Sequence, residues 1–326
     1  MTNVKTYVKK GVMKENFDII RIVDISRLYY ENHLTQAEIA KKLKISRPTV
    51  SKLLGEAKKR GIVKIELKSP LESNSLLLDQ LAVIYKLEGG LIVPTTSSDK
   101  NLNDKLTTSQ GAMYLERLLD SMKNLGLGWG YSLGTLIDAL NPQKPKESMD
   151  RTVCPIIGSA GNAIKWYQTN ELARVFAEKT GFTPYFLHAP AFPLSEENKR
   201  LFENTFEFQK ISNLWSDLDT VVLSIGTYPS VPDQATAARF GNKLRESRAV
   251  GMIASYYFDI DGNIIESEND IVIRLPLEIL RKVERVIAIS FGEKKISSTR
   301  GALLTGLITH LVTDEITARE ILEITP

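Results

Sequence analysis

The stretch TQAEIAKKLKISRPTVSKLL, from Thr35 to Leu54, predicts two short helices joined by a tight turn. Thr35, followed three positions later by Glu38, is the capping-box pattern that opens a helix. Ser46 with Pro48 marks the start of a second helix, because proline is tolerated in a first turn, where its missing N–H is not needed. This spacing is typical of a helix-turn-helix, whose second helix enters the major groove of DNA.

The polar side chains of this stretch are the candidates for contacts with DNA. Val50, Leu53, Leu54 and Ala57 share one helical face, which predicts that this face is buried. The opposite face begins with an arginine that can reach a base edge. We expect DNA contacts from Gln36, Ser46, Arg47, Thr49, Ser51 and Lys52.

The turn between the two helices departs from the usual pattern. Lys44 stands where glycine is common, so either Lys44 adopts a left-handed conformation at some cost or the turn differs slightly. An alternative interpretation also exists, because any two amphipathic helices joined by a short turn would share the apolar spacing without binding DNA.

Basic charge is concentrated at the start of the chain. Residues 1–68 hold 16 Lys and Arg against 7 Asp and Glu, a net charge of +9, so residues 69–326 carry a net charge of −6. Neutralisation of phosphates by Lys and Arg dominates nucleic-acid affinity. The segregation therefore indicates a DNA-binding domain joined to a neutral or acidic sensor, whereas a merely solvated charged surface would not require it.

The sequence flanking the two helices predicts a small winged domain. Residues 1–14 form a basic arm, and Phe17 to Tyr30 predict a helix that completes a three-helix unit. After Gly61, the run IVKIEL alternates apolar and polar residues like the strand of a β wing. A linker follows at SPLESNS, so we expect a helix-turn-helix domain over residues 1–68 and a ligand-binding and oligomerisation domain over residues 69–326.

The larger part of the chain predicts a doubly wound, Rossmann-like α/β domain. Strand-like runs such as VCPII, DTVVLSIG and RVIAISFG alternate with helical runs such as NELARVFAEKTG and ITAREILE. This alternation implies a parallel sheet with helices on its faces, and ligands of such sheets bind outside the carboxyl ends of the strands. We also expect strands at TPYFLHAP and VGMIASYYF and a helix at TAARFGNKLRES.

A Leu-rich amphipathic helix, LLLDQLAVIYKLEG, opens this domain ahead of the strand GLIVP. Such a helix beside a linker can pair between two subunits. It can equally cover the edge of its own sheet, and the sequence leaves both alternatives open.

Glycine-rich turns after predicted strands are the candidates for a ligand site. In GLGWGYSLGTLIDAL, residues 126–140, Gly130 lets the backbone turn and Ser132 opens a helix, which is an anion-binding arrangement. Such turns are also often merely structural, and this one is neither a Walker loop nor a GxGxxG fingerprint. Similar turns occur at GSAGN, residues 158–162, and at GEKK, where Lys295 is either a cation for a bound phosphate or a solvated lysine.

Other residues argue for a reduced, metal-free protein. The single cysteine, Cys154, lies in an apolar run and predicts a buried strand residue, and His33, His188 and His310 lack metal-ligand spacing. The N-terminus lacks an apolar signal core and no apolar run reaches membrane-spanning length, so we expect a soluble, cytoplasmic protein without a metal or cofactor.

The chain resembles the SorC family of bacterial transcriptional regulators from about Phe17 onward. The resemblance rests on the helix-turn-helix sequence and on LGWGYS, NELAR, LHAPA, YYFDIDG, the glycine turn that ends at Lys295, and LVTDEITAREIL. It implies a C-terminal sugar-binding domain related to sugar-phosphate isomerases and deaminases. It also implies a phosphorylated sugar as effector, bound by Gly130, Ser132, Gly158, Gln168, Asp259 and Lys295.

One departure from the family limits the chemistry of the site. Some members carry a basic residue before the second glycine turn, including a lysine that binds a pentose phosphate covalently, whereas Pro155 to Gly158 read PIIG here. A covalent Schiff base is therefore not expected at this position, which favours a sugar monophosphate.

The leading hypothesis is a DNA-binding regulator of carbohydrate metabolism, without catalytic residues, whose operator affinity changes when a sugar phosphate binds. A homodimer or homotetramer is expected because the two half-sites of an operator require two DNA-binding domains. The alternative is a sugar-phosphate isomerase or deaminase with an appended DNA-binding head. Asp259 and His188 are its only candidates for acid/base catalysis, and Asp259 can equally be a turn residue.

Overall fold

The computed structural model describes residues 19–63, 75–141, 150–161, 164–229 and 236–324. The chain divides into two compact units, Met1–Pro70 and Leu71–Pro326. The expected basic arm, the β wing from residue 64 onward and the linker lie outside the described residues.

The smaller unit is a three-helix assembly, as predicted. Its helices are residues 19–30, α2 (Gln36–Leu43) and α3 (Arg47–Lys59). The side chains that hold them together are fully or almost fully buried and come from all three helices: Ile25, Ile39, Val50 and Leu54. This arrangement leaves the first turn of α3 free to face a partner.

The caps of both reading helices are confirmed. The Thr35 hydroxyl accepts from the Glu38 amide at 3.3 Å, and the Glu38 carboxylate accepts from the Thr35 amide at 2.7 Å. The Ser46 hydroxyl accepts from the Thr49 amide at 3.2 Å. Lys44 adopts the left-handed conformation, with φ 53° and ψ 46°, at the position where glycine would be free of steric cost.

The larger unit is built on a seven-stranded parallel sheet with the order β1-β11-β10-β5-β2-β3-β4. The predicted doubly wound fold is therefore confirmed. The strands are β1 (Gly89–Val93), β2 (Asn124–Leu127), β3 (Thr152–Pro155), β4 (Thr183–Pro184), β5 (Thr220–Ser224), β10 (Arg285–Ile289) and β11 (His310–Asp314).

The order of these strands reverses between β2 and β5. Strands β3 and β4 follow β2 towards one edge, whereas β10 and β11 follow β5 towards the other. Ligands of doubly wound sheets bind in the crevice that forms at such a reversal. The fold therefore predicts a ligand site at the carboxyl ends of β2 and β5.

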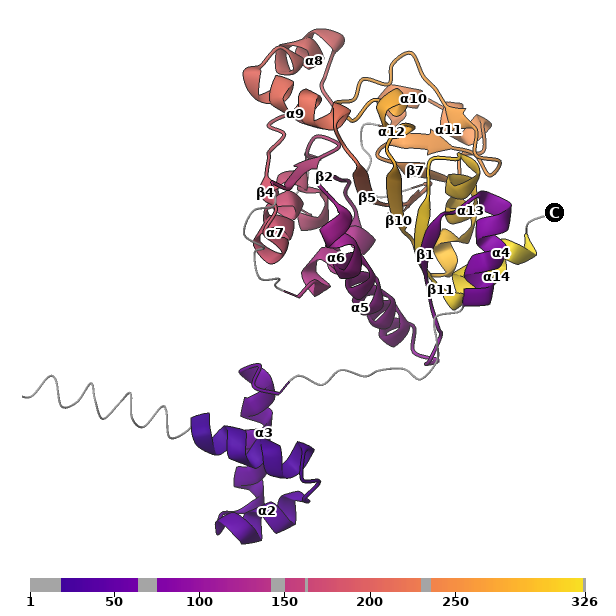
Figure 1. The fold of residues 1–326 in the computed structure, drawn as a ribbon. Helices are drawn as coiled ribbons and strands as arrows, with labels where there is room; N and C mark the ends of the chain where they lie inside the picture. The colour runs from indigo at the N-terminus through magenta and orange to yellow at the C-terminus, as the bar shows by residue number, and fades with distance from the viewer. Residues whose placement is uncertain (1–18, 64–74, 142–149, 162–163, 230–235, 325–326) are drawn as a thin grey trace, which may run out of the picture. The chain divides into compact units, whose positions relative to one another are not determined.

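Helices cover both faces of the sheet (Figure 1). Because side chains alternate along a strand, Val221 and Leu223 of β5 enter one core while Val222 enters the other. The Val222 side is covered by α5 (Lys100–Leu118), α6 (Tyr131–Ala139) and α7 (Thr169–Thr180). The opposite side is covered by α4 (Ser75–Tyr85), α9 (Phe206–Ser216), α12 (Leu277–Leu280), α13 (Ile296–Leu304) and α14 (Glu315–Glu323).

The Leu-rich helix α4 covers its own unit. Leu77, Leu81 and Tyr85 are buried in the core, and α4 packs beside α14 and β1 (Figure 1). Its outer face remains apolar, since Leu76 and Val83 are 79% and 83% exposed. The sheet-covering alternative is thus observed, while the outer face keeps pairing between subunits open.

A second, four-stranded antiparallel sheet was not predicted. The run VGMIASYYF is a hairpin rather than one strand, because Ala254 and Ser255 take left-handed conformations at a turn. TAARFGNKLRES forms two short helices, α10 (Thr236–Phe240) and α11 (Lys243–Glu246), and TPYFLHAP is a strand only at β4. The second sheet comprises β6 (Gly226–Thr227), β7 (Gly251–Ile253), β8 (Tyr256–Phe258) and β9 (Ile264–Ile265).

Candidate functional site

The exposed face of α3 carries the predicted DNA-reading side chains. Arg47, Ser51 and Lys52 are exposed, and Arg47 is the first residue of the helix. The hydroxyls of Ser46 and Thr49 lie 2.7 Å apart, so these two residues also hold the start of the helix together. Arg47 and Lys52 are therefore the long donors of this face, while the cap orients them.

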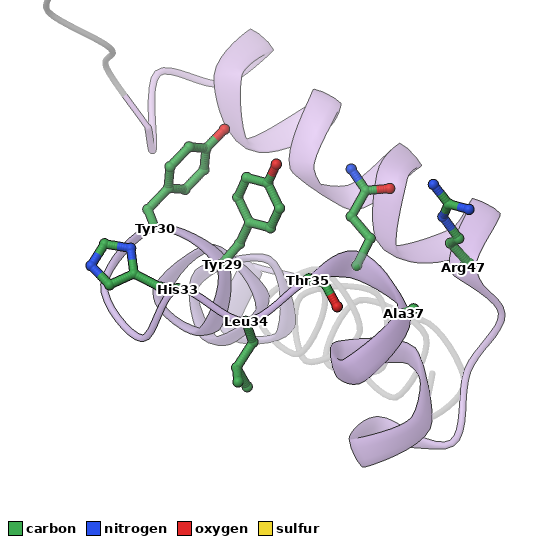
Figure 2. Close-up of a pocket in the computed structure, with 8 residues that line it drawn as sticks. Tyr29, Tyr30, His33, Leu34, Thr35, Ala37 and Arg47 are labelled. Carbon is green, nitrogen blue, oxygen red and sulfur yellow. The ribbon is translucent and has the colours of Figure 1, made fainter.

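A hollow of about 860 Å³ lies beside Arg47 (Figure 2). Tyr29 and Tyr30 from the end of the first helix and His33 from the loop after it line the hollow together with Gln36 and Arg47. Tyrosine hydroxyls, glutamine amides and guanidinium groups are donors that bind phosphate oxygens of DNA. Tyr29, Tyr30 and His33 were not predicted as site residues, although the polar aromatic residues directly before the helix-turn-helix were a signal for them.

The turn after β2 places the start of α6 against the end of β5. Gly130 has a φ of 117°, and a Cβ on it would lie 2.2 Å from the Ser224 hydroxyl. That hydroxyl donates to the Trp129 carbonyl at 2.6 Å, which ties the ends of β5 and β2 together. Ser132 in the first turn of α6 therefore lies where the strand order reverses.

Lys295 meets Ser132 at this place, as expected from the sequence. The Lys295 ammonium donates to the Ser132 hydroxyl at 3.0 Å, although 163 positions separate the two residues. No side chain caps α6 at Gly130 in the described part of the chain. The ammonium therefore lies at the positive end of a helix dipole, where an anion would be favoured.

Desolvation disfavours the charged form of the Lys295 ammonium. It lowers the pKa of Lys295 to about 8, and the nearby Asp104 carboxylate only partly opposes the shift. Burial also raises the pKa of Asp104, whereas Lys100 and Lys295 act in the other direction. The arrangement is thus a partly buried cation whose charge the Asp104 carboxylate only partly compensates, and it can accept an anionic ligand.

The third glycine turn adjoins the same pair. The Gly292 amide donates to the Asp314 carboxylate at 2.6 Å and to the Thr317 hydroxyl at 3.0 Å. These two hydrogen bonds fix the backbone of the turn that precedes Lys295. They therefore fix the position from which the lysine side chain extends into the site. Sequence alone could not pair this turn with Asp314, since the two meet only through the sheet.

The remaining predicted effector residues have other partners in this structure. The Gly158 amide donates to the Ile273 carbonyl at 3.0 Å, and a Cβ there would lie 2.6 Å from backbone atoms of Pro190 and Ala191. The Gln168 amide group donates to the Ala160 carbonyl at 3.3 Å. Gly158 therefore has a clear packing role besides its predicted one.

Asp259 occupies the tip of the β8–β9 hairpin. Its carboxylate accepts from the amides of Asp261 and Asn263 at 3.0 and 2.9 Å, which supports the turn-residue alternative. The hairpin lies against Gly301 of α13, well along the helix from Lys295. The structure thus joins Ser132 with Lys295 and does not bring the Asp259 carboxylate to that pair.

Comparison with known proteins identifies the family. Residues 69–323 match the family described as "Putative sugar-binding domain", and residues 25–70 match the MarR family. The sorbitol operon regulator of Klebsiella pneumoniae is 32% identical over 330 residues, which cover 95% of this chain and 100% of that protein. The chain belongs to the SorC family. Its members named here are transcriptional regulators and not enzymes, which agrees with the leading hypothesis from the sequence.

Further relatives of this SorC-family regulator agree in fold and length. The deoxyribonucleoside regulator of Bacillus subtilis is 30% identical over 91% of this chain and 95% of its own. The crystal structure of the full-length sorbitol operon regulator SorC from Klebsiella pneumoniae has a TM-score of 0.73 at 28% identity, covering 94% of this chain and 99% of that one. The protein is thus a DNA-binding transcriptional regulator with a sugar-binding domain.

The described residues hold neither a membrane-spanning helix nor a cluster of metal ligands. None of the helices there has the length and apolarity needed to cross a bilayer. Nor do three or more His, Cys, Asp or Glu side chains of the described ranges gather as metal ligands. Cys154 is buried as predicted, and burial raises the pKa of its thiol to about 12, so the thiolate form is disfavoured.

Proposed function

We propose that this regulator changes its affinity for an operator when a phosphorylated sugar binds at Ser132 and Lys295. The observation that carries the proposal is the partly buried Lys295 ammonium at the uncapped start of α6, 3.0 Å from the Ser132 hydroxyl. A phosphate there would gain a charge-assisted bond and the first-turn amides of α6. The names of the sorbitol and deoxyribonucleoside regulators support a carbohydrate as the rest of the ligand.

Control of transcription follows from differential binding. The effector must bind one arrangement of the protein better than another, and it can change operator affinity only by that difference, typically about 1–3 kcal/mol. Paired reading heads on a homodimer or homotetramer would let one such change alter both half-site contacts. The exposed Leu76 and Val83 of α4 offer an apolar face for this pairing.

Whether the effector must carry a phosphate can be tested by comparing phosphorylated sugars with their unphosphorylated parent sugars. We expect sugar phosphates to raise the melting temperature of the protein in a thermal-shift screen, because a ligand that binds the folded state stabilises it. Each unphosphorylated parent sugar serves as the matched control and should give a much smaller shift. If parent sugars stabilise the protein as much as their phosphates, the proposed anion site is not the effector site.

Effector affinity should depend on pH through Lys295. Below pH 8 the ammonium is mostly charged, and phosphate binding favours this charged form. Affinity should therefore be nearly constant from pH 7 to 8 and fall above pH 8, by up to about tenfold per pH unit. Calorimetric titration of the tightest sugar phosphate measures this fall.

A matched variant identifies the group that causes the pH dependence of effector affinity. Lys295→Arg keeps a positive charge throughout this range, so its affinity should stay flat where that of the wild type falls. The same decline in Lys295→Arg would assign the pH dependence to another group.

A further inference from the structure

The hollow beside Arg47 is lined by hydrogen-bond donors that lack an acceptor. Among the described residues that line it, none is acidic. Its longest donor side chains form neither a hydrogen bond nor an ion pair within the described ranges: Tyr29, Tyr30, Gln36 and Arg47. A set of unused donors around one hollow indicates a ligand that brings its own acceptor oxygens.

Packing holds the two tyrosine hydroxyls of this set in place. The rings of Tyr29 and Tyr30 pack against the core of the three-helix unit and meet edge to face, with centroids 4.9 Å apart and planes at 85°. A tyrosine side chain has few rotatable bonds, so little conformational entropy is lost when its hydroxyl binds a partner. Figure 2 shows both hydroxyls and the Arg47 guanidinium on the same side of the start of α2.

The charge and the size of the surroundings favour a strand of DNA as the occupant. Residues 19–63 hold 10 Lys and Arg against 4 Asp and Glu, a net charge of +6. The Glu38 carboxylate does not line the hollow, and it already accepts from the Thr35 amide and hydroxyl at 2.7 Å each. A volume of about 860 Å³ has room for several linked groups rather than one small ion. Arg47 both lines the hollow and begins α3, so the hollow adjoins the DNA-reading face.

We propose that this hollow binds the sugar-phosphate backbone of one DNA strand, where Tyr29 and Tyr30 donate to phosphate oxygens at the edge of the major groove that α3 enters. Gln36, at the start of α2, donates to the same stretch of backbone. These contacts position α3 without reading bases, because phosphates carry no sequence information. They involve neither Ser132 nor Lys295, so the binding of DNA here is independent of the proposed effector site.

Phenylalanine substitutions test the two hydroxyls while the rings stay packed. Fluorescence anisotropy compares the full-length proteins, without added sugar, on a duplex that the wild type selects from a random-sequence library and on a scrambled duplex. Tyr29→Phe combined with Tyr30→Phe should weaken both duplexes alike, by about tenfold or more, because hydrogen bonds to a charged acceptor are lost. The salt dependence should stay unchanged, since a neutral hydroxyl releases no counterion from DNA.

A matched control removes a hydroxyl elsewhere. Tyr185→Phe changes a half-buried tyrosine that packs against the core of the sugar-binding unit, and it should change neither affinity. Far-ultraviolet circular dichroism and melting curves check that each variant is folded.

A second variant tests the hollow without altering the tyrosines. Gln36→Glu places a negative charge in the first turn of α2, which the positive end of a helix dipole favours, so the helix is retained. The added charge should repel the backbone and weaken both duplexes by about tenfold or more. Gln80→Glu adds the same charge to an exposed position of α4 and should leave both affinities unchanged.

Uncharged phosphates locate the contact on the DNA. Phosphates of the selected duplex are replaced one at a time by methylphosphonate, which lacks the negative charge. At a phosphate bound in the hollow, this replacement should weaken the wild type more than the double phenylalanine variant, because that variant has already lost the contact.

The contrary results are equally distinct. The hollow does not bind the DNA backbone if the double phenylalanine variant or Gln36→Glu binds both duplexes as tightly as the wild type. Weakening of the selected duplex alone would assign the tyrosines to base reading or to the orientation of α3 instead. Equal methylphosphonate effects in the wild type and the double variant at every position would show that the two hydroxyls contact no phosphate.

Discussion

Replacing Lys295 by methionine should raise the stability of the ligand-free protein and at the same time weaken the effector by roughly 10- to 150-fold. The loss in affinity follows from a charge-assisted contact of about 1.5–3 kcal/mol. The gain in stability follows from the pKa of about 8, because the unfolded chain holds the proton more tightly than the folded one. For a domain of this size each kcal/mol corresponds to about 2–4 °C in melting temperature.

The sign of the stability effect can be checked by measuring the free energy of unfolding as a function of pH. Since the folded pKa is lowered, the ligand-free wild type should gain stability between about pH 8 and 10.5, whereas Lys295→Met should not gain it there. Ser132→Ala is the matched control for affinity and should cost only about 1 kcal/mol, or about fivefold. Wild-type affinity in Lys295→Met would show that the lysine has no part in phosphate binding.

Replacing Arg47 by alanine should weaken operator binding by about 1–3 kcal/mol and relax its sequence preference. Arg47 begins α3 on the exposed face, with its helix start held by Ser46 and Thr49, and we expect it to contact a base edge. Fluorescence anisotropy with specific and scrambled duplexes at a fixed salt concentration measures both quantities.

A comparison of the Arg47 and Lys52 variants distinguishes a sequence-specific base contact from a non-specific phosphate contact. Lys52→Ala should weaken all duplexes alike and reduce the salt dependence, because a phosphate contact carries no sequence information. Arg281→Ala removes an exposed arginine from the sugar-binding unit and should leave binding unchanged. Intact operator selectivity in Arg47→Ala would contradict the assigned orientation of α3.

Local signals predicted the parts of this molecule that local chemistry determines. The Thr35 and Ser46 caps and the strand–helix alternation depend on neighbours within a few residues, whereas the left-handed conformation of Lys44 was one of two alternatives that the sequence left open. The Ser132–Lys295 contact could be proposed because glycine turns mark strand ends, and parallel strands bring their carboxyl ends to one edge.

Features that depend on distant packing were missed. The hairpin in VGMIASYYF needs two non-glycine residues in the left-handed region, which propensity does not predict. Asp104 gave no signal at all, because it lies within a helix of ordinary polar composition and acquires its neighbours only when α5 packs beside α6. Tyr29 and Tyr30 line the hollow beside Arg47, although the sequence indicated only that a helix ends near them.

The pairing of β1 with β11 has a consequence for the order in which the protein is made. Gly89 to Val93 pair with His310 to Asp314, so the first strand of the sheet waits for the last one to leave the ribosome. The core of the three-helix unit joins side chains within the described residues 19–63, so it can form while the rest of the chain is still being synthesised. A nascent chain therefore acquires its DNA-reading part before it has a complete sheet on which to sense a ligand.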